Sequence, residues 1–249
     1  MHASARPTLP FVLVFLAFAA SACAKDPSKD VAAARVSEPA AAPSPAEPAA
    51  APVAAAAAEP AAAPVAAPVA APGAAAAPAP AALPLAGSVF FTGSKVTGSH
   101  LCEFKQWTGT VTLVDGKAEG GAFDFTVQTA SVEADVGTRN DWTGKLETHL
   151  KSDEFFDVAK FPTATFTSSA ITAGGENGAS HTVRGNLTMR GTTKEVTFPA
   201  TIAAVGKDVT GKAEFSINRK DFGIVYTGKA DDLIRDGVVL RIEAKATLP

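Results

Sequence analysis

Strict alternation of apolar and polar residues in the C-terminal part of the chain is the feature that most constrains its fold. Apolar residues occupy alternate positions over most of Val209–Ile217, and the same period returns in Val238–Leu248. A period of two places successive side chains on opposite faces of a strand, so each segment has one dry and one wet face. Three further strand regions, Phe161–Thr172, His181–Arg190 and Lys194–Val205, follow similar patterns. The sequence therefore predicts an all-β domain with an antiparallel sheet.

Further strands precede this region. A first strand begins at Ser88–Phe91, with an expected break at Gly93-Ser94, and a later strand turns at Asp115-Gly116, a strong hairpin signal. The longest strand region, Ala122–Asp135, changes parity around Gln128-Thr129, where we expect a β-bulge that curves the sheet. About eight strands joined by short turns are typical of a closed barrel.

Proline divides the chain into parts. The segment from Pro39 to Pro84 holds twelve of the 18 prolines and consists almost only of Ala, Pro and Val. Its proline-free runs are too short for a stable helix, and it has no side chains to build a core. We expect a disordered, semi-rigid linker over residues 23–84, with a reach on the order of 150 Å if extended. The folded domain is expected over residues 85–249, which hold 12 of the 15 phenylalanines.

Residues 1–22 have the pattern of a secretory signal peptide. Arg6 precedes the apolar run Phe11–Ala19, which is too short to span a membrane, and three small residues then lead to Cys23. This arrangement resembles a bacterial lipobox, which implies lipidation of Cys23; the alternative is simple cleavage that leaves a soluble periplasmic protein. Ala24, in place of Asp, favours the outer membrane by resemblance to a known sorting rule. The expected location is the bacterial cell envelope, on the periplasmic side.

Charge and cysteine content argue against a nucleic-acid-binding protein and against a disulfide-stabilised protein. The folded domain carries 18 Lys and Arg against 20 Asp and Glu, interspersed along the chain, so no basic stripe is present and no nucleic-acid partner is expected. Lipidation of Cys23 would leave Cys102 without a partner, so no disulfide framework is expected. Cys102 is expected to pack as a small apolar residue in or beside a strand.

One short helix interrupts the strands. Leu146 and Leu150 define the apolar side of an amphipathic segment that begins at Lys145. An acidic and aromatic turn, Asp153–Asp157, follows it, and the chain turns again at Phe161-Pro162. A lone helix that delivers three phenylalanines into an all-β domain predicts a lid over the mouth of a barrel.

Three ordered motifs support a family resemblance. The first consists of His149–Ser152, Phe155–Val158 and Phe161–Thr163; the second is Gly185–Lys194, and the third is Arg219–Ile224. Together they resemble the signature of the YceI-like domain family. The resemblance implies a lipocalin-like, eight-stranded antiparallel β-barrel with one short helical lid, which binds polyisoprenoid-type lipids and has no catalytic activity.

The expected inward faces also favour an apolar ligand. They mix phenylalanine with small residues, which leave volume, and no ionisable residue recurs on them. Burial of each methylene contributes about 0.8 kcal/mol, so a long isoprenoid tail needs no polar contact. A packed core without a cavity remains the alternative. The residues expected to bind the ligand are Phe90, Phe104, Phe123, Phe125, Phe155, Phe156, Phe161, Phe166, Met189, Phe198, Phe215 and Phe222.

Within this set we expect two roles. Phe155, Phe156, Phe161 and Phe222 are expected to gate the mouth. The interior is expected to be lined by Phe123, Phe125, Phe166, Phe198 and Phe215.

Catalytic and metal-binding motifs are absent from the sequence. It contains no HExxH, CxxC or GxSxG pattern and no dinucleotide glycine motif, and no cofactor is expected. His149 could donate a hydrogen bond to a quinone head group or cap the turn after the helix. Asp153, Glu154 and Asp157 are expected to form local ion pairs and caps.

The sequence thus predicts a protein that binds an isoprenoid lipid or quinone as a carrier, scavenger or sensor, attached to the membrane through its lipid anchor. A homodimer is left open. The alternatives are an interaction module without a ligand and an enzyme that acts on such a lipid through His149.

Overall fold

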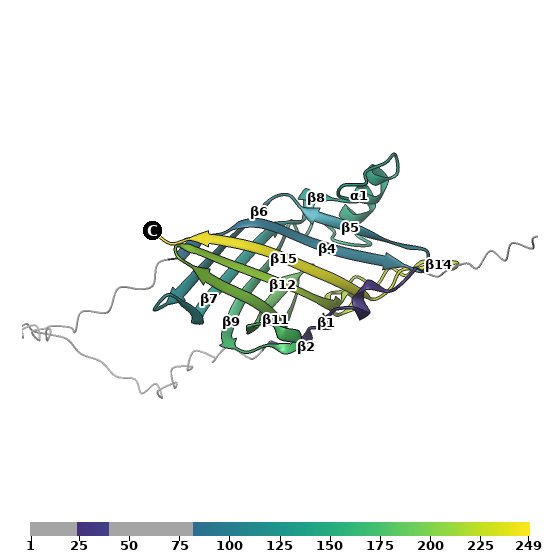
Figure 1. The fold of residues 1–249 in the computed structure, drawn as a ribbon. Coiled ribbons are helices and arrows are strands. Elements are labelled where there is room, and N and C mark those ends of the chain that lie inside the picture. The colour runs from purple at the N-terminus through teal and green to yellow at the C-terminus, as the bar shows by residue number, and fades with distance from the viewer. Residues whose placement is uncertain (1–23, 40–81) are drawn as a thin grey trace, which may run out of the picture.

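The structure is a computed structural model that describes residues 24–39 and 82–249, and antiparallel strands dominate it (Figure 1). The main strands are β3 (Ala82–Pro84), β4 (Ala86–Lys95), β5 (Gly98–Phe104), β6 (Trp107–Val114), β7 (Lys117–Gln128), β8 (Val132–Glu133), β9 (Thr163–Ala173), β10 (His181–Met189), β11 (Thr192–Val205), β12 (Asp208–Asn218) and β15 (Gly237–Thr247). Shorter elements are η2 (Thr129–Ser131), α1 (Thr143–Lys151), η3 (Glu176–Gly178), η4 (Arg219–Phe222), β13 (Gly228–Lys229) and β14 (Asp232–Leu233).

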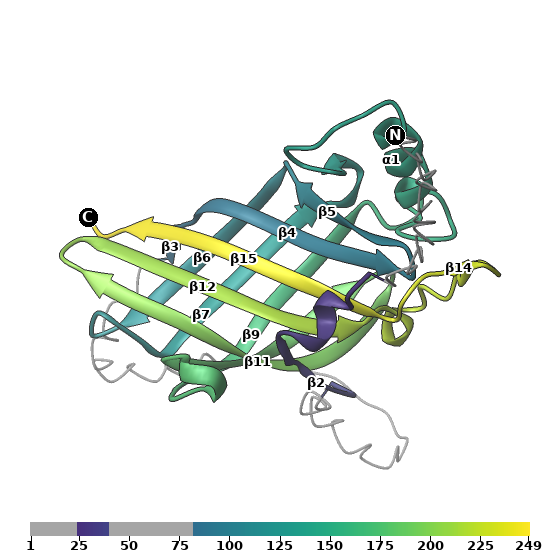
Figure 2. The same ribbon diagram turned by 45° about the vertical axis from the view of Figure 1, so that its right-hand side comes forward.

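The sheet closes through one bent strand. β3 pairs with β6 at one edge of the sheet, and β4, which follows β3 after the single residue Leu85, pairs with β15. The other neighbours follow in the order β6, β7, β9, β10, β11, β12 and β15, each antiparallel to the next. The predicted antiparallel barrel is therefore confirmed, and its curved wall is visible in Figure 2.

The local signals in the sequence locate most turns. Asp115 and Gly116 have φ of 52° and 74°, as the predicted hairpin between β6 and β7 requires. The β-bulge expected near Gln128 is instead the turn η2, after which β8 pairs with β5. The break expected at Gly93-Ser94 is wrong, because both residues pair with β5 and the turn comes after Lys95.

The helix α1 covers one end of the barrel (Figure 2). Leu150 and Phe156 are buried and join the main core cluster, so they attach the helix and the turn that follows it to the strands. The helix has buried residues on one side and exposed residues on the other, as its amphipathic sequence predicts. No other α-helix occurs in the described part of the chain, and none of its helices is long and apolar enough to cross a bilayer.

Residues 24–39, which we call the N-terminal strap, pack against the barrel wall. They form η1 (Pro27–Lys29), β1 (Ala32–Ala33) and β2 (Arg35–Ser37). β11 and β12 pair with each other only near their shared hairpin, between Ala200 and Ala213. Beyond that point β1 pairs in parallel with β12 and β2 pairs antiparallel with β11, so the strap fills the space where the two strands separate.

The strap corrects part of the linker prediction. The sequence placed residues 23–84 in a disordered linker, whereas residues 24–39 and β3 (Ala82–Pro84) are strands and turns of the folded domain. Local composition failed here because the strap is stabilised by strands far away in the sequence. The predicted signal peptide, the predicted lipidation site Cys23 and residues 40–81 of the linker lie outside the described residues.

Candidate functional site

Aromatic rings line one wall of the barrel interior. Phe125, Phe166, Phe198 and Phe215 come from β7, β9, β11 and β12, and consecutive ring centroids are 5.6, 5.5 and 4.1 Å apart. The ring of Phe166 crosses over β10 at Gly185, where a Cβ atom would lie 2.6 Å from its Cζ atom. Glycine at this position therefore lets the rings on β9 and β11 meet across the intervening strand.

A second aromatic cluster lies beneath α1. The ring centroids of Phe91, Phe104 and Phe156 are 5.3 to 5.6 Å apart, and all three side chains are buried. Sequence analysis named Phe90 and missed Phe91. Phe90 points outward, where the Arg241 guanidinium lies 4.5 Å from its ring centroid, so this predicted ligand-binding residue does not face the interior. The alternation of residues along β4 could have identified Phe91, because Phe91 lies on the same face as the buried Val89.

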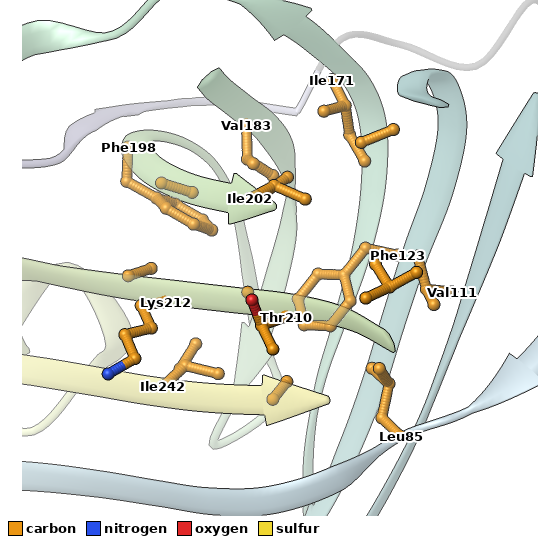
Figure 3. A pocket seen from close by; sticks show the side chains of 16 residues that line it. Leu85, Val111, Phe123, Ile171, Val183, Phe198, Ile202, Thr210, Lys212 and Ile242 are labelled. Atoms are coloured by element: carbon orange, nitrogen blue, oxygen red, sulfur yellow. The ribbon is translucent and has the colours of Figure 1, made fainter. Parts of the chain in front are cut away.

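A small hollow lies at the end of the barrel away from α1 (Figure 3). This far-end hollow has a volume of about 70 Å³, and its lining is apolar except for Thr210 and Lys212. Figure 3 shows the Phe123 ring and the side chains of Val183 and Ile242 around it. A cavity of this size is well below the range of roughly 300–1,000 Å³ that small-molecule sites occupy.

Two adjoining hollows lie at the helix end. The outer hollow, about 290 Å³, is lined by α1 and by the loop that carries Tyr226, and the inner hollow, about 100 Å³, lies deeper among apolar side chains. They share Phe91, Gly93, Leu150, Phe155 and Ile234. The inner hollow is also lined by Phe104, Phe156, Met189, Ile217, Val238 and Leu240.

An aromatic layer divides the interior. On β12, Ala213 lines the far-end hollow and Ile217 lines the inner hollow, and the buried Phe215 lies between them on the same face. Its ring is stacked on that of Phe198 at 4.1 Å. Within the described residues no side chain lines both the far-end hollow and the inner hollow, so the barrel holds separate spaces at its two ends.

Polar groups in the outer hollow are mostly paired with one another. His149 Nε2 lies 2.5 Å from Glu154 Oε2, and the His149 ring packs edge-on against Phe155 and Tyr226. Lys95 donates to Asp232 at 2.5 Å, and this hydrogen bond holds the pKa of the Asp232 carboxyl below its usual value. An apolar molecule can therefore enter without leaving these charges unpaired.

One buried hydroxyl in the outer hollow is unsatisfied. Ser94 is 3% exposed, and its Oγ atom has no hydrogen-bond partner among the described residues. Buried polar atoms are normally hydrogen-bonded, so this hydroxyl is an exception among the buried groups of β4.

The expected local ion pairs of the acidic turn are partly observed. Asp157 accepts a hydrogen bond from Lys160 at 3.0 Å, and Glu154 pairs with His149. The Arg190 side chain donates to the backbone carbonyls of Asp153 and Phe155, which ties the turn to the β10–β11 hairpin. Among the described residues, no group of three or more His, Cys, Asp or Glu is placed to hold a metal ion.

The predicted site residues fall into separate groups. Phe104, Phe155, Phe156 and Met189 line the helix-end hollows, Phe123 and Phe198 line the far-end hollow, and Phe125, Phe166 and Phe215 belong to the aromatic wall. The four residues predicted to gate the mouth do not form one group. Phe222 is 0% exposed, and the Phe161 ring packs against Gly191 of the β10–β11 turn.

Cys102 lies on β5 beside the outer hollow and is 1% exposed. Burial, with a further contribution from the Asp135 charge, raises the pKa of its thiol to about 12. Because the thiolate is the reactive form, we expect Cys102 to stay unmodified by a thiol-specific reagent at pH 8 in the folded protein and to react fully in denaturant. Thiol titration followed by mass spectrometry measures this. Rapid modification of Cys102 in the native state would contradict the buried position.

A family comparison agrees with the barrel and its motifs. The model of the YceI-like domain matches residues 82–246, most of the described structure. The chain belongs to the YceI-like family. The YceI-like domain thus includes β3, three residues before the boundary expected from the sequence.

Curated relatives of the YceI-like domain are bacterial. A UPF0312 protein of Pseudomonas fluorescens is 37% identical over 139 residues, which cover 53% of this chain and 67% of the relative. Protein YceI of Salmonella arizonae is 36% identical over 127 residues, which cover 49% of this chain and 61% of the relative. The chain therefore spans about two thirds or less of the length of these relatives.

Solved structures share the fold of the YceI-like domain. BcnA of Burkholderia cenocepacia matches with a TM-score of 0.52 at 26% identity, over 64% of this chain and 96% of BcnA. A polyisoprenoid binding domain of Saccharophagus degradans matches with a TM-score of 0.51 at 15% identity, over 69% of this chain and all of that domain. These likenesses support the barrel assignment.

Proposed function

We propose that the YceI-like domain binds a long apolar lipid, such as a polyisoprenoid or an isoprenoid quinone, at the helix end of the barrel. The observation that carries the proposal is the pair of adjoining hollows, in which an apolar inner space leads into a partly polar outer one. The apolar lining of the inner hollow suits a hydrocarbon tail, and the outer hollow offers the side chains of His149 and Tyr226 to a head group. The structural neighbour described as a polyisoprenoid binding domain supports this assignment.

The size of the hollows sets a condition on binding. At about 290 Å³ the outer hollow lies just below the range of roughly 300–1,000 Å³ for small-molecule sites, and at about 100 Å³ the inner hollow lies well below it, so a long tail requires side chains to move. Met189 and Phe155 line the inner hollow and are only partly buried, so they can change rotamer with less repacking than the core rings. Each methylene that enters contributes about 0.8 kcal/mol, which offsets the cost of this rearrangement.

The proposed setting is the bacterial cell envelope. A lipid-modified Cys23 would hold the protein on the periplasmic side of the outer membrane, where it would act as a carrier, scavenger or sensor. The signal-like segment and the small residues before Cys23 support this setting. No catalytic step is proposed, because the relatives and the apolar hollows favour a binding protein.

Mass spectrometry of lipid extracted from the native protein tests the function. After expression in a quinone-producing bacterium, we expect an isoprenoid lipid bound to the wild-type protein. Met189→Trp, which fills the inner hollow, is expected to reduce the bound lipid at least tenfold. Val205→Trp is the matched control, because Val205 is 77% exposed and lines none of the hollows described above.

Two outcomes would count against the proposal. A wild-type protein that carries no lipid, or a Met189→Trp protein that carries as much lipid as the control, would contradict it. His149→Ala separates binding from catalysis, because we expect lipid binding to survive this change. Circular dichroism and thermal unfolding of each variant verify that the fold is intact.

A further inference from the structure

The N-terminal strap begins at the helix end of the barrel. The Ala24 N–H donates to the Val96 carbonyl at 3.0 Å, and the Arg235 guanidinium donates to the carbonyls of Ala24 and Lys25. Arg235 lines the inner hollow, and Lys95, next to Val96, lines the outer hollow. The chain that precedes residue 24 therefore joins the domain beside the opening of these hollows, as the start of the purple segment shows in Figure 2.

This position changes the role expected for the linker. The sequence predicted that residues 23–84 would separate the folded domain from its anchor by a long reach. In the structure the strap and β3 both pack on the barrel, so residues 40–81 connect two points of the same domain. Their length cannot increase the distance between Ala24 and the helix-end hollows.

Exposed apolar side chains surround the same end of the barrel. Trp142, which precedes α1, is 70% exposed, Val225 is 63% exposed and Leu233 is 48% exposed. The Leu233 carbonyl accepts a hydrogen bond from the N–H of Val96, whose own carbonyl binds Ala24. Val225 is the neighbour of Tyr226, which lines the outer hollow, and Trp142 lies one turn before Leu146, which also lines it.

The side chain of Trp142 is suited to a bilayer surface. The Lys145 Nζ atom lies 4.0 Å from its ring centroid, so the exposed indole carries a positive charge beside it. Trp is enriched at membrane interfaces because it is apolar with one polar N–H group, and Lys can extend its ammonium towards the head groups. The exposed side chains of Val225, in the loop before β13, and Leu233, on β14, add apolar contact area.

We infer that the helix end of the barrel is a membrane-docking surface, formed by Trp142, Lys145, Val225 and Leu233 around the outer hollow. A bilayer is the occupant because Ala24, which follows the predicted lipidation site Cys23, is held at this surface. The opposite end also exposes Val114 and Val205, but the strap does not begin there. Docking in this orientation directs the outer hollow at the lipid phase, so a tail passes into the barrel without crossing water.

Fluorescence quenching tests the orientation. The full chain contains two tryptophans, and we expect brominated phospholipids in phosphatidylethanolamine–phosphatidylglycerol vesicles to quench Trp142. In a Trp107→Phe protein, where Trp142 is the reporter, we expect at least half of the emission to be lost. The matched reporter is Val205→Trp in a chain with Trp107→Phe and Trp142→Phe, which we expect to stay unquenched at the opposite end.

Serine substitutions test the contributing side chains. In the Trp107→Phe protein, the double change Val225→Ser and Leu233→Ser is expected to reduce the quenching of Trp142 at least twofold, whereas Val114→Ser with Val205→Ser leaves it unchanged. No quenching of Trp142, or equal quenching of both reporters, would overturn the inference. The inference rests on the proposed function. Failure of membrane docking can be distinguished from failure of lipid binding, because the amount of lipid inside the barrel is measured separately by mass spectrometry.

Discussion

Arg219→Ala is expected to lower the free energy of unfolding by about 3–5 kcal/mol. The Arg219 side chain is 4% exposed, and it donates to the backbone carbonyls of Ile224 at 2.7 Å, Arg235 at 3.1 Å and Ile234 at 3.3 Å. Removing it leaves these carbonyls without their donor, and each buried unsatisfied group costs about 1–3 kcal/mol. Urea denaturation followed by circular dichroism measures the effect.

The adjacent Lys220 provides the control for Arg219. Its ammonium pairs with Asp236, which Arg219 also contacts, but the Lys220 side chain is 43% exposed. We expect Lys220→Ala to change the free energy of unfolding by less than about 1 kcal/mol. Equal effects at the two positions would show that Arg219 acts only as a surface charge. Because Ile224 and Ile234 line the inner hollow, Arg219→Ala is also expected to reduce lipid binding.

Deletion of residues 27–38 is expected to remove the strap and lower the free energy of unfolding by about 2–4 kcal/mol, because each lost backbone hydrogen bond contributes about 1 kcal/mol. This deletion keeps Ala24–Asp26 next to Cys23. It removes the pairing of β1 with β12 and of β2 with β11, and the bond from the Ala34 N–H to the Ser216 carbonyl. Hydrogen exchange should rise at least a hundredfold for strap-paired amides in residues 195–197 and 215–216.

Arg35→Ala is the control for the strap. The Arg35 side chain is 81% exposed and pairs with Glu176, which is also exposed, so its loss should cost less than about 0.5 kcal/mol. If deletion of residues 27–38 leaves both the free energy of unfolding and the rate of hydrogen exchange unchanged, the strap does not stabilise the barrel wall where β11 and β12 separate.

Local sequence patterns predicted the barrel but not the strap. The alternation in β12 and β15 determines which side chains face the core, and the Asp115-Gly116 turn determines a hairpin, so these features were readable from short segments. The strap strands β1 and β2 are two and three residues long, too short for any period to be visible. Their position depends on the separation of β11 and β12, which only the assembled sheet produces.

The sequence predicted the apolar character of the candidate site but not the arrangement of its side chains. An apolar interior with many phenylalanines followed from the inward faces, and the lid helix was placed correctly. The adjacent pair Phe90 and Phe91 required the correct strand parity. Whether the interior is hollow depends on how rings pack, and the stacked Phe198 and Phe215 fill the middle of the barrel. Side-chain packing of this kind depends on contacts between distant strands.

The strap also has a consequence for how the barrel is assembled during synthesis. Ala32 pairs with Phe215 and Ala33 with Ser216, so the first described segment of the chain depends on a strand made near the end of translation. Contacts between such distant segments form late, because the closing of long loops is slow. Until β12 has been made, the strap has no complete binding site.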